Sequence, residues 1–416
     1  TSLSDKDAEK FTSDLDGYAV SVNDTKDSLV LVKAHAHFLC GGNSCTKVGH
    51  TQETSMVTFK PWDKTNELPT TAGNWYLTNN VTLTGTWSPK DGTVLCLNGH
   101  SITANGNITA IYVIDITFTL CDCKDGGKSA YGQITHPVGN TGSGVYVSGT
   151  GVFHMYGGSI TGNTADNGGG VYMGGENSKF NMYGGEISGN TSVYNDHATV
   201  NGGGVYLGGT MTVSGDAKIV KNKKGDEINN VFLPQNLVSK NYYTMTIGGG
   251  GLTSGASIGV TASKALADGE AVTIVSSGAA SGSENYFTAD AGTPYNIQRV
   301  DGTLVLVNGT LTHKHPICGK KCTHTSKHED VTWTAINSAE ALKKAAGGSS
   351  ESDTKYYYLT NDVTLDSTWT PSGYLALDLG DYALTTTQSV DTIQLNSGAN
   401  LTLTSCGTHG GTVQHS

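Results

Sequence analysis

The chain has 416 residues, of which 56 are glycine, and only 15% are charged; glycine is thus far above its usual ~7%, and charged residues are well below their usual ~25%. The net charge is −11 and Arg299 is the only arginine, which excludes a phosphate-reading nucleic-acid surface, because such surfaces concentrate Lys and Arg. No window of 18 uncharged apolar residues occurs, so this sequence predicts no membrane insertion.

Residues 1–34 are interpreted as the tail of a preceding unit, because the strings that come next in the chain are copied later in it. The string "SLVLVKAHAHFLCGGNSC" at 28–45 returns at 303–322 as "TLVLVNGTLTHKHPICGKKC", with small gaps near the cysteines. Likewise, "WYLTNNVTLTGTW" at 75–87 returns without a gap at 357–369 as "YYLTNDVTLDSTW", at a nearly equal offset. The repeated order of parts predicts a segment of a longer tandem array, monomeric within that array.

Residues 35–62 form a junction rich in histidine and cysteine, and residues 311–335 form a second one. In each, two thiolates and two imidazoles are spaced so that they could surround a structural zinc ion. The candidate ligands are His37, Cys40, Cys45, His50, His315, Cys318, Cys322 and His328, with His35, His313 and His324 in the same sets. Two alternatives stay open: a local disulfide within each cysteine pair, or exposed thiols in a linker. A catalytic zinc is not expected, since the chain has no HExxH motif.

Residues 63–235 carry a shorter repeat, which predicts a parallel β-helix. "FHMYGGSITGNT" at 153–164 matches "FNMYGGEISGNT" at 180–191, and "MTVSGDAKIVKN" at 211–222 is a degenerate third copy. A period of about 20–30 residues, with β-branched and aromatic residues alternating between Gly and Asn, is typical of strands stacked in a solenoid. We therefore expect an all-β fold with one repeat in each coil.

Alternation within a copy predicts which side chains face the interior. In "GVYV", Val145 and Val147 should point inward and Tyr146 outward. The copies end in asparagine, as at Asn163 and Asn190, and we expect these residues to stack from coil to coil as a hydrogen-bonded ladder. The glycine-rich phrases "GSGVYV", "GGGVYM" and "GGGVYL" are interpreted as corners that a side chain would obstruct, because no helix follows them to bind a phosphate.

Cys96 and Cys121 are candidates for a disulfide. Their separation along the chain is close to one coil, and the second copy has Asp378 and Thr404 in their places. Both have apolar neighbours in the sequence and should point outward, so strands stacked about 4.8 Å apart would allow a bond between them. Two further cysteines are equivalent between the copies and have no predicted partner: Cys123 and Cys406.

Two surface features are candidate binding sites. The outward Tyr146, Tyr172 and Tyr206 should stack in register as a flat stripe, which either binds sugar rings and protein partners or only stabilises the coils. The inserted string "SVYNDHATVN" lengthens one coil and should bulge from the surface, which makes Asp196 and His197 candidate contact residues.

The remaining segments are a cap and a second solenoid. Residues 236–310 lack the asparagine-ended copies but keep short alternating strands, which predicts a β-rich cap or further irregular coils. Residues 336–416 are interpreted as the start of a second β-helix. We expect a helix over "NSAEALKKAAG" there, with Asn337 as its N-cap, Glu340 three residues later and Gly347 as its stop.

The alternation of "GGGVY" with "ITGN", "ISGN" and "IVKN" is similar to the paired short motifs of the chlamydial polymorphic membrane proteins. From about Cys40 to its end, the chain resembles more closely the glycine-rich right-handed β-helix modules of large repetitive, adhesin-like surface proteins of Gram-positive gut bacteria. In those modules "LPTTAGNWYLTNNVTL" and "LCLNGHSI" look like standard opening segments. The resemblance implies a right-handed parallel β-helix solenoid with a β-rich cap, repeated in tandem. It also implies an extracellular location with cell-surface attachment through regions outside this segment, and it transfers no catalytic residue.

These observations predict a non-catalytic bacterial cell-surface protein, either adhesin-like or a structural stalk. Its expected partners are host glycans or host glycoproteins, such as immunoglobulin or mucin. The alternative is a glycan-active hydrolase or lyase, a class that β-helices also host. An inverting hydrolase needs paired carboxylates about 6.5–9.5 Å apart. The strings "GHS", "NDH" and "AKI" do not reproduce the "NTD", "DD", "GHG" and "RIK" motifs of polygalacturonases, so no catalytic residue is predicted.

Overall fold

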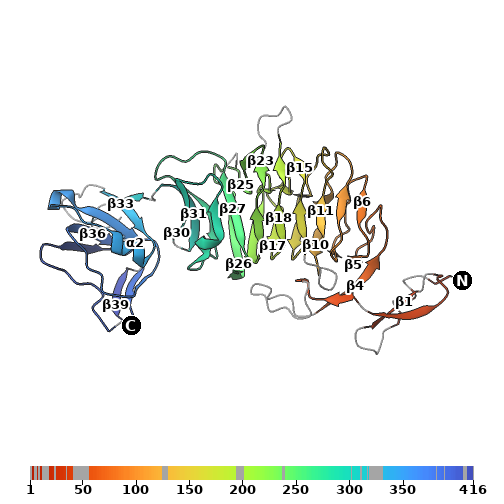
Figure 1. Cartoon of the computed structure of the whole chain (residues 1–416), viewed down its shortest axis with the longest axis horizontal. Helices are drawn as coiled ribbons and strands as arrows, with labels where there is room; N and C mark the ends of the chain where they lie inside the picture. The colour runs from red at the N-terminus through yellow and green to blue at the C-terminus, as the bar shows by residue number, and fades with distance from the viewer. Residues whose placement is uncertain are drawn as a thin grey trace. The chain divides into compact units, whose positions relative to one another are not determined.

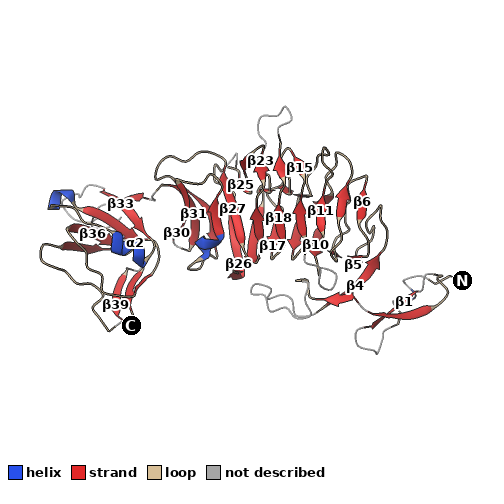
Figure 2. Ribbon diagram, in the orientation of Figure 1, coloured by secondary structure: helices blue, strands red, loops and turns tan. Residues whose placement is uncertain are grey.

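The computed structural model describes most of the chain, which folds into two compact units, Thr1–Thr261 and Ala262–Ser416. The described residues are 2–3, 7, 10–11, 18–22, 25–33, 35–40, 56–123, 130–193, 201–236, 239–300, 302–309, 312–315, 317, 331–380, 382–387, 389–405 and 410–415. Nearly all regular structure is strand, as Figure 2 shows by colour, and most strands belong to parallel sheets stacked in a solenoid. None of the helices in these ranges is both long and apolar enough to cross a bilayer.

Each complete coil of the first unit contains three main strands, and each strand pairs in parallel with its equivalents on neighbouring coils (Figure 1). The first face consists of β5 (Asn74–Leu77), β7 (Thr93–Cys96), β10 (Thr117–Cys121), β13 (Val152–Met155), β17 (Lys179–Met182), β21 (Thr210–Gly215) and β26 (Met245–Leu252). The second consists of β6 (Val81–Leu83), β8 (Ile102–Ala104), β11 (Gln133–Thr135), β14 (Ser159–Thr161), β18 (Glu186–Ser188), β22 (Lys218–Val220) and β27 (Ser257–Ala262). The third consists of β9 (Ile111–Ile114), β12 (Val145–Ser148), β16 (Val171–Met173), β20 (Val205–Tyr206) and β25 (Val231–Leu233). A corner sheet adds β15 (Thr164–Ala165), β19 (Thr191–Ser192), β23 (Lys223–Lys224) and β24 (Glu227–Ile228).

The strand register pairs the copies that the repeat predicts. Phe153 lies opposite Phe180 and Met155 lies opposite Met182. All four side chains are fully buried. The rings of Phe118, Phe153 and Phe180 stack in turn, with centroids 5.8 and 5.0 Å apart. One repeat is therefore one coil.

The alternation predicted for "GVYV" is confirmed. Val145 and Val147 are fully buried, whereas Tyr146 between them is half-buried. Val145 pairs with Val171, and Tyr146 pairs with Tyr172 on the next coil. Each of four successive coils thus gives apolar side chains to the interior and one tyrosine to the outer surface, namely Tyr112, Tyr146, Tyr172 and Tyr206.

Buried asparagines stack along one corner, as predicted. Asn163 Nδ2 donates to Asn190 Oδ1 over 2.8 Å, and Asn190 Nδ2 donates to Asn222 Oδ1 over 2.9 Å. The last step, from Asn222 Nδ2 to Asn230 Oδ1, measures 3.0 Å. At the other end, Nδ1 of His136 lies 2.7 Å from Asn163 Oδ1. We call these five residues the asparagine ladder; it supplies partners for polar groups that the corner buries.

The glycine just before the Val-Tyr pair of each glycine-rich phrase marks a close approach between coils. A Cβ at Gly170 would lie 2.6 Å from the carbonyl oxygen of Gly204 and 3.0 Å from Nδ2 of Asn190. A Cβ at Gly144, one coil earlier, would lie 2.9 Å from the Gly170 carbonyl oxygen. The phrase therefore leaves room for the next coil and for the asparagine ladder.

Replacing Gly170 with alanine is expected to lower the free energy of unfolding of the first unit by about 2 kcal/mol, because the added methyl overpacks a filled space. Gly85→Ala is the matched control, since a Cβ there would meet no atom within 4 Å. We expect that control to change stability by less than about 0.5 kcal/mol. Urea denaturation followed by circular dichroism measures both variants, and equal stability would contradict the close approach.

The N-terminal segment adds antiparallel strands to the first unit. β1 (Tyr18–Val22) and β2 (Leu29–Lys33) form a hairpin. β3 (His35–His37) then pairs antiparallel with β4 (Val57–Trp62), and β4 pairs in parallel with β5 of the first face. The strand that carries two histidines is thereby joined to the edge of the solenoid.

The parallel pairing continues past Gln235, through β26 and β27, before antiparallel strands follow in the second unit. There β28 (Ala271–Ser277) and β30 (Tyr295–Val300) both pair antiparallel with β31 (Thr303–Asn308). Parallel coils then resume. The remaining elements are η1 (Ser283–Tyr286), β29 (Phe287–Ala289), β32 (Thr312–His315), β33 (Val331–Ile336), α2 (Ala339–Lys344), η2 (Glu351–Asp353), β34 (Lys355–Leu359), β35 (Val363–Leu365), β36 (Tyr374–Asp378), β37 (Ala383–Thr386), β38 (Asn400–Thr404) and β39 (Thr412–His415).

The helix α2 lies within the predicted string, with two corrections. Its N-cap is Ser338, whose side-chain oxygen accepts the Ala341 N–H over 3.2 Å, so Asn337 does not cap it. The helix also ends before Gly347, which is therefore not its stop.

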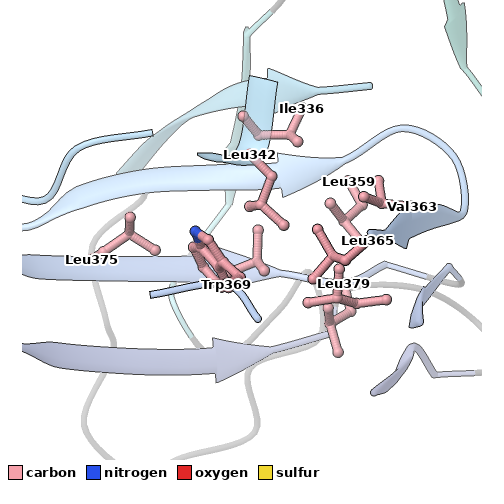
Figure 3. Packing of buried hydrophobic residues seen from close by; sticks show 10 residues of the cluster. Ile336, Leu342, Leu359, Val363, Leu365, Trp369, Leu375 and Leu379 are labelled. Carbon is pink, nitrogen blue, oxygen red and sulfur yellow. The ribbon is translucent and has the colours of Figure 1, made fainter. Parts of the chain in front are cut away.

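Figure 3 shows the core that α2 joins. Its Leu342 is fully buried in the same cluster as Trp369. The other buried members are Ile336, Leu359, Val363, Leu365, Leu375, Leu377, Leu379 and Leu384. The helix thus adds one apolar anchor to a core that is built mainly by strands.

Candidate metal centre

Four side chains that can bind a metal lie together beside the first face of the first unit. They are His35 and His37 of β3, Cys96 at the end of β7, and Cys123 two residues after β10. One potential ligand atom from each lies within 4.8 Å of all the others. We call these four residues the metal centre; no second group of this kind occurs among the side chains that the structure describes.

Strand register explains how the two cysteines meet. β7 and β10 are neighbours, with Cys96 opposite Cys121, so Cys123 lies one coil away from Cys96. Strand alternation turns Leu95 toward the solenoid interior and Cys96 toward the outer side. Phe59 of β4 packs there against Cys96 and Cys121, and both cysteines are fully buried. The antiparallel β3–β4 pair therefore forms a cover and brings its histidines to the sulfur atoms.

Two of the interatomic distances fit a tetrahedral ion. The Sγ atoms of Cys96 and Cys123 lie 3.6 Å apart, and Cys123 Sγ lies 3.4 Å from His35 Nε2. Zinc bonds of about 2.3 Å to sulfur and about 2.0–2.1 Å to nitrogen would separate neighbouring ligand atoms by about 3.3–3.8 Å. These two distances fall in that range, and all four ligand atoms lie within 4.8 Å of one another, so the residues fit an ion such as zinc.

His37 presents an unused nitrogen to this centre. Its Nδ1 lies 2.6 Å from the Phe38 carbonyl oxygen. Because a carbonyl only accepts hydrogen bonds, Nδ1 carries the proton and Nε2 keeps its lone pair. Nε2 is buried and has no hydrogen-bond partner among the described residues. A buried polar atom without a partner is costly, and a metal ion would satisfy it.

Aromatic packing holds both imidazole rings in place. The His35 ring stacks on Tyr76 with centroids 3.9 Å apart and planes 10° from parallel. The His37 ring stacks on Phe59 with centroids 4.5 Å apart. The two imidazoles meet edge to face at 5.1 Å. Such packing limits the rotation of each ring and favours a preformed site.

The environment keeps both thiols protonated when no metal is bound. Burial is the main cause that raises the pKa of Cys96 well above its usual range. The hydrogen bond with Cys96, followed by burial, raises the pKa of Cys123 to about 11, while His35 and His37 act in the opposite direction. Zinc binds the thiolate, so an ion bound here would displace these protons. Cys123 Sγ also donates to Asn98 Oδ1 over 3.2 Å, which orients the sulfur.

The predicted Cys96–Cys121 disulfide stays a prediction. The two residues are direct register partners on adjacent strands. The structure holds Cys96 as a thiol, and its sulfur contacts Cys123. A metal and a disulfide would compete for Cys96, and mass spectrometry of the unreduced protein distinguishes the two states.

The local zinc sets predicted from the junctions are only partly described. His37 belongs to the metal centre, whereas the half-buried Cys40 does not. For His315 only the backbone is described, in β32. The other predicted ligands lie outside the described residues: Cys45, His50, Cys318, Cys322 and His328. The local sets and their disulfide alternatives therefore stay predictions.

Sequence reasoning missed the combination of ligands. It placed Cys96 in a disulfide and left Cys123 unassigned. One signal was present, because Cys96 and Cys123 are separated along the chain by the same spacing as Phe153 and Phe180 of successive repeats. Nothing in the repeat pattern predicted that β3 would lie against the outer side of the first face.

The tyrosines stack in register, but not as a flat stripe. Tyr146 pairs with Tyr112 and Tyr172, and Tyr172 pairs with Tyr206. Successive ring planes meet at 61°, 41° and 82°, with centroids 5.2–5.4 Å apart. Tilted and edge-on rings cover one another, which favours mutual stabilisation over a continuous platform. The other two candidate contact residues lie outside the described ranges: Asp196 and His197.

Comparison of the chain with protein-family models, curated proteins and solved structures yields no match in any of the three. The solenoid-like fold therefore rests on the parallel strands themselves. The resemblance to one particular group of surface repeats stays a prediction.

Proposed function

We propose that this chain is a non-catalytic module of an extracellular bacterial surface protein, in which a structural zinc ion at the metal centre fastens the N-terminal strands to the solenoid. The observation that carries the metal assignment is the buried Nε2 of His37. It has no hydrogen-bond partner among the described residues, and it belongs to a compact group with three other ligand atoms.

A structural role fits the centre better than a catalytic one. Four protein ligands complete a tetrahedron, whereas catalytic zinc sites keep a position open for water or substrate. His37 and Cys96 are buried, and Phe59 and Tyr76 pack around them. Two of the four ligands are thus shielded from solvent, and the other two, His35 and Cys123, are half-buried, so the centre lies under the β3–β4 pair and not in an open cleft.

The short length of β3 explains why a metal would matter. Its pairing with β4 involves only three residue pairs, and a short two-stranded contact is marginal in water. An ion bound to His35 and His37 would link β3 directly to two coils through Cys96 and Cys123. Metal binding then contributes to folding of the junction. In a tandem array, such junctions would stiffen a stalk that presents its side faces to host glycans or host proteins.

Metal analysis of the purified chain tests this proposal. Cys96→Ser and Cys123→Ser should each bind about one zinc ion fewer per chain than the natural protein. Cys45→Ser and His50→Ala are the matched controls and should retain that ion. After cobalt(II) substitution, the sulfur-to-metal charge-transfer band should weaken in each Cys96 or Cys123 variant.

The opposite result would assign the metal to the ligands predicted within the first junction, residues 35–62. Loss of zinc in Cys45→Ser and His50→Ala, with full retention in Cys96→Ser, would rule out the metal centre. Shortened products after incubation with neutral or acidic polysaccharides would instead favour the glycan-active enzyme.

A further inference from the structure

A groove in the first unit recurs at the equivalent position in the second unit. The first groove has a volume of about 610 Å³, and its lining includes Thr86, Asn107, Thr109, Tyr112, Asp166 and Tyr172. The second has a volume of about 660 Å³ and is lined by Thr368, Ser389, Val390, Asp391, Thr392 and His415. The gapless alignment of 75–87 with 357–369, continued along the chain, maps Thr86, Asn107 and Thr109 onto Thr368, Ser389 and Asp391. The groove is therefore part of the repeated architecture.

A histidine recurs at both grooves, where His415 belongs to the lining of the second and the buried His136 lies outside the lining of the first. His136 lies two residues after the partner of Ile102 in β11, and His415 lies two residues after the partner of Leu384 in β39. Ile102 and Leu384 are equivalent in the same alignment. In the first unit, Nε2 of His136 lies 2.7 Å from the Ile108 carbonyl oxygen and so holds the turn at the groove. The two units thus place a histidine at the same register position, while the side chains that line the two grooves differ. Rigid scaffolds carry variable binding sites in this way.

Two asparagine side chains in the first groove are held in place through their oxygen atoms, while their amide N–H donors are unused. Asn107 Oδ1 accepts the Thr141 N–H over 3.0 Å, and Asn167 Oδ1 accepts the Asn201 N–H over 2.9 Å. Both asparagines line the groove. Their Nδ2 groups make no hydrogen bond within the described part of the chain. Each amide is therefore oriented by the scaffold and offers its N–H groups to a ligand.

Tyrosine rings form an apolar part of the same lining. Tyr112 is 36% exposed and is the first member of the tyrosine stack. Among the described residues, its only ring contact is with Tyr146, at 5.4 Å. Tyr172 also lines the groove. Aromatic rings beside fixed amide and hydroxyl groups match a sugar, which has apolar C–H faces and polar edges.

The charge of the lining selects among sugars. Among the described residues, the lining contains one carboxylate, Asp166, and no lysine or arginine. The whole chain carries a net charge of −11. The described lining therefore offers an acidic sugar no cation to pair with, and the net negative charge of the chain disfavours its approach. The lining spans three turns, at 107–109, 141–143 and 165–167, which corresponds to about 10 Å at a spacing of about 4.8 Å.

We propose that this groove binds a neutral oligosaccharide of hexose or N-acetylhexosamine units, with Asn107 and Asn167 donating to its oxygens and Tyr112 packing against a ring. The proposal rests on the binding role proposed for the module, and it names the ligand class and the site.

Titration of the full chain by NMR with defined trisaccharides tests the groove. The neutral probes are cellotriose, maltotriose and N,N′,N″-triacetylchitotriose; the acidic probes are trigalacturonic acid and 3′-sialyllactose. Asn107→Asp keeps an oxygen for the Thr141 N–H but removes the donor, and Tyr112→Ala removes the ring. Both should weaken binding of a neutral probe by about tenfold or more. The exposed Asn79→Asp, outside the groove, should stay within about twofold.

Asn107→Ser is a second variant for the case in which Asn107→Asp does not fold, because Ser389 occupies the equivalent position in the second unit. Preference for an acidic probe, binding that ignores the variants, or no binding of any probe would overturn the groove proposal. Zinc content measured on the same samples tests the metal centre separately. Cleavage of a probe would overturn the non-catalytic function itself.

Discussion

Replacing Asn190 with alanine is expected to lower the free energy of unfolding of the first unit by about 3–5 kcal/mol. Asn190 Oδ1 accepts both the backbone N–H and the Nδ2 of Asn163, over 3.1 and 2.8 Å. Its Nδ2 donates to the Ile160 carbonyl and to Asn222 Oδ1. Because Asn163, Asn190 and Asn222 are fully buried, water cannot replace the lost partners. Each orphaned group costs about 1–3 kcal/mol.

Asn79→Ala is the matched control for this substitution. Asn79 is exposed, and its Nδ2 donates to the Asp63 carbonyl oxygen over 3.2 Å. Water can take over that bond, so we expect a change within about 0.5 kcal/mol. Urea denaturation of both variants measures the difference. A loss below about 1 kcal/mol for Asn190→Ala would mean that the asparagine ladder is not a main source of stability.

Periodicity explains why so much of the solenoid could be predicted from the sequence. A coil-length repeat places equivalent residues on top of one another, so one local rule about Val145 or Asn163 holds for each coil that carries the repeated motif. The alternation of buried and exposed residues depends only on strand geometry. Neither inference required knowledge of how distant segments meet.

The helix cap shows the limit of a purely local rule. Asn337 and Ser338 are both good N-cap residues, and the sequence alone does not decide between them. In the structure Ser338 has an extended backbone, and its side chain accepts the Ala341 N–H. The start of the helix follows from β33, which ends at Ile336 and leaves only two residues before α2.

The metal centre could not be predicted from local sequence patterns, because its ligands meet only through contacts between distant segments. Its ligands come from β3, from the end of β7 and from beyond β10, and only the strand register and the cover formed by β3–β4 bring them together. The second unit has a similar apolar cover, in which Trp333 packs with Tyr358. There Asp378 pairs with Tyr358 as Cys96 pairs with Tyr76 in the first unit. A sulfur ligand at this position is therefore particular to the first unit.

Removal of the metal is expected to loosen the N-terminal cover and to leave the coils folded. The interior is held by stacked rings and by the asparagine ladder, and neither includes a residue of the metal centre. β3 lacks such support, because it is the edge strand of its sheet and its pairing with β4 involves three residue pairs. If zinc is present at about a hundred times its Kd, its loss removes about 2.7 kcal/mol from the closed state. Amide exchange in β3 and β4 should then accelerate by about a hundredfold.

Hydrogen exchange followed by mass spectrometry, with and without a chelator, measures this effect for each segment. Peptides from β17 and β21 serve as the internal reference and should keep their exchange rates. In His37→Ala, exchange in β3 and β4 should already be fast, and the chelator should add nothing, even if it strips an ion from another junction. If amide exchange accelerated equally in all segments, the metal would stabilise the whole fold and not only the N-terminal cover. An unchanged rate in β3 and β4 would show that the cover closes without an ion, because stacking of His35 on Tyr76 and of His37 on Phe59 then suffices.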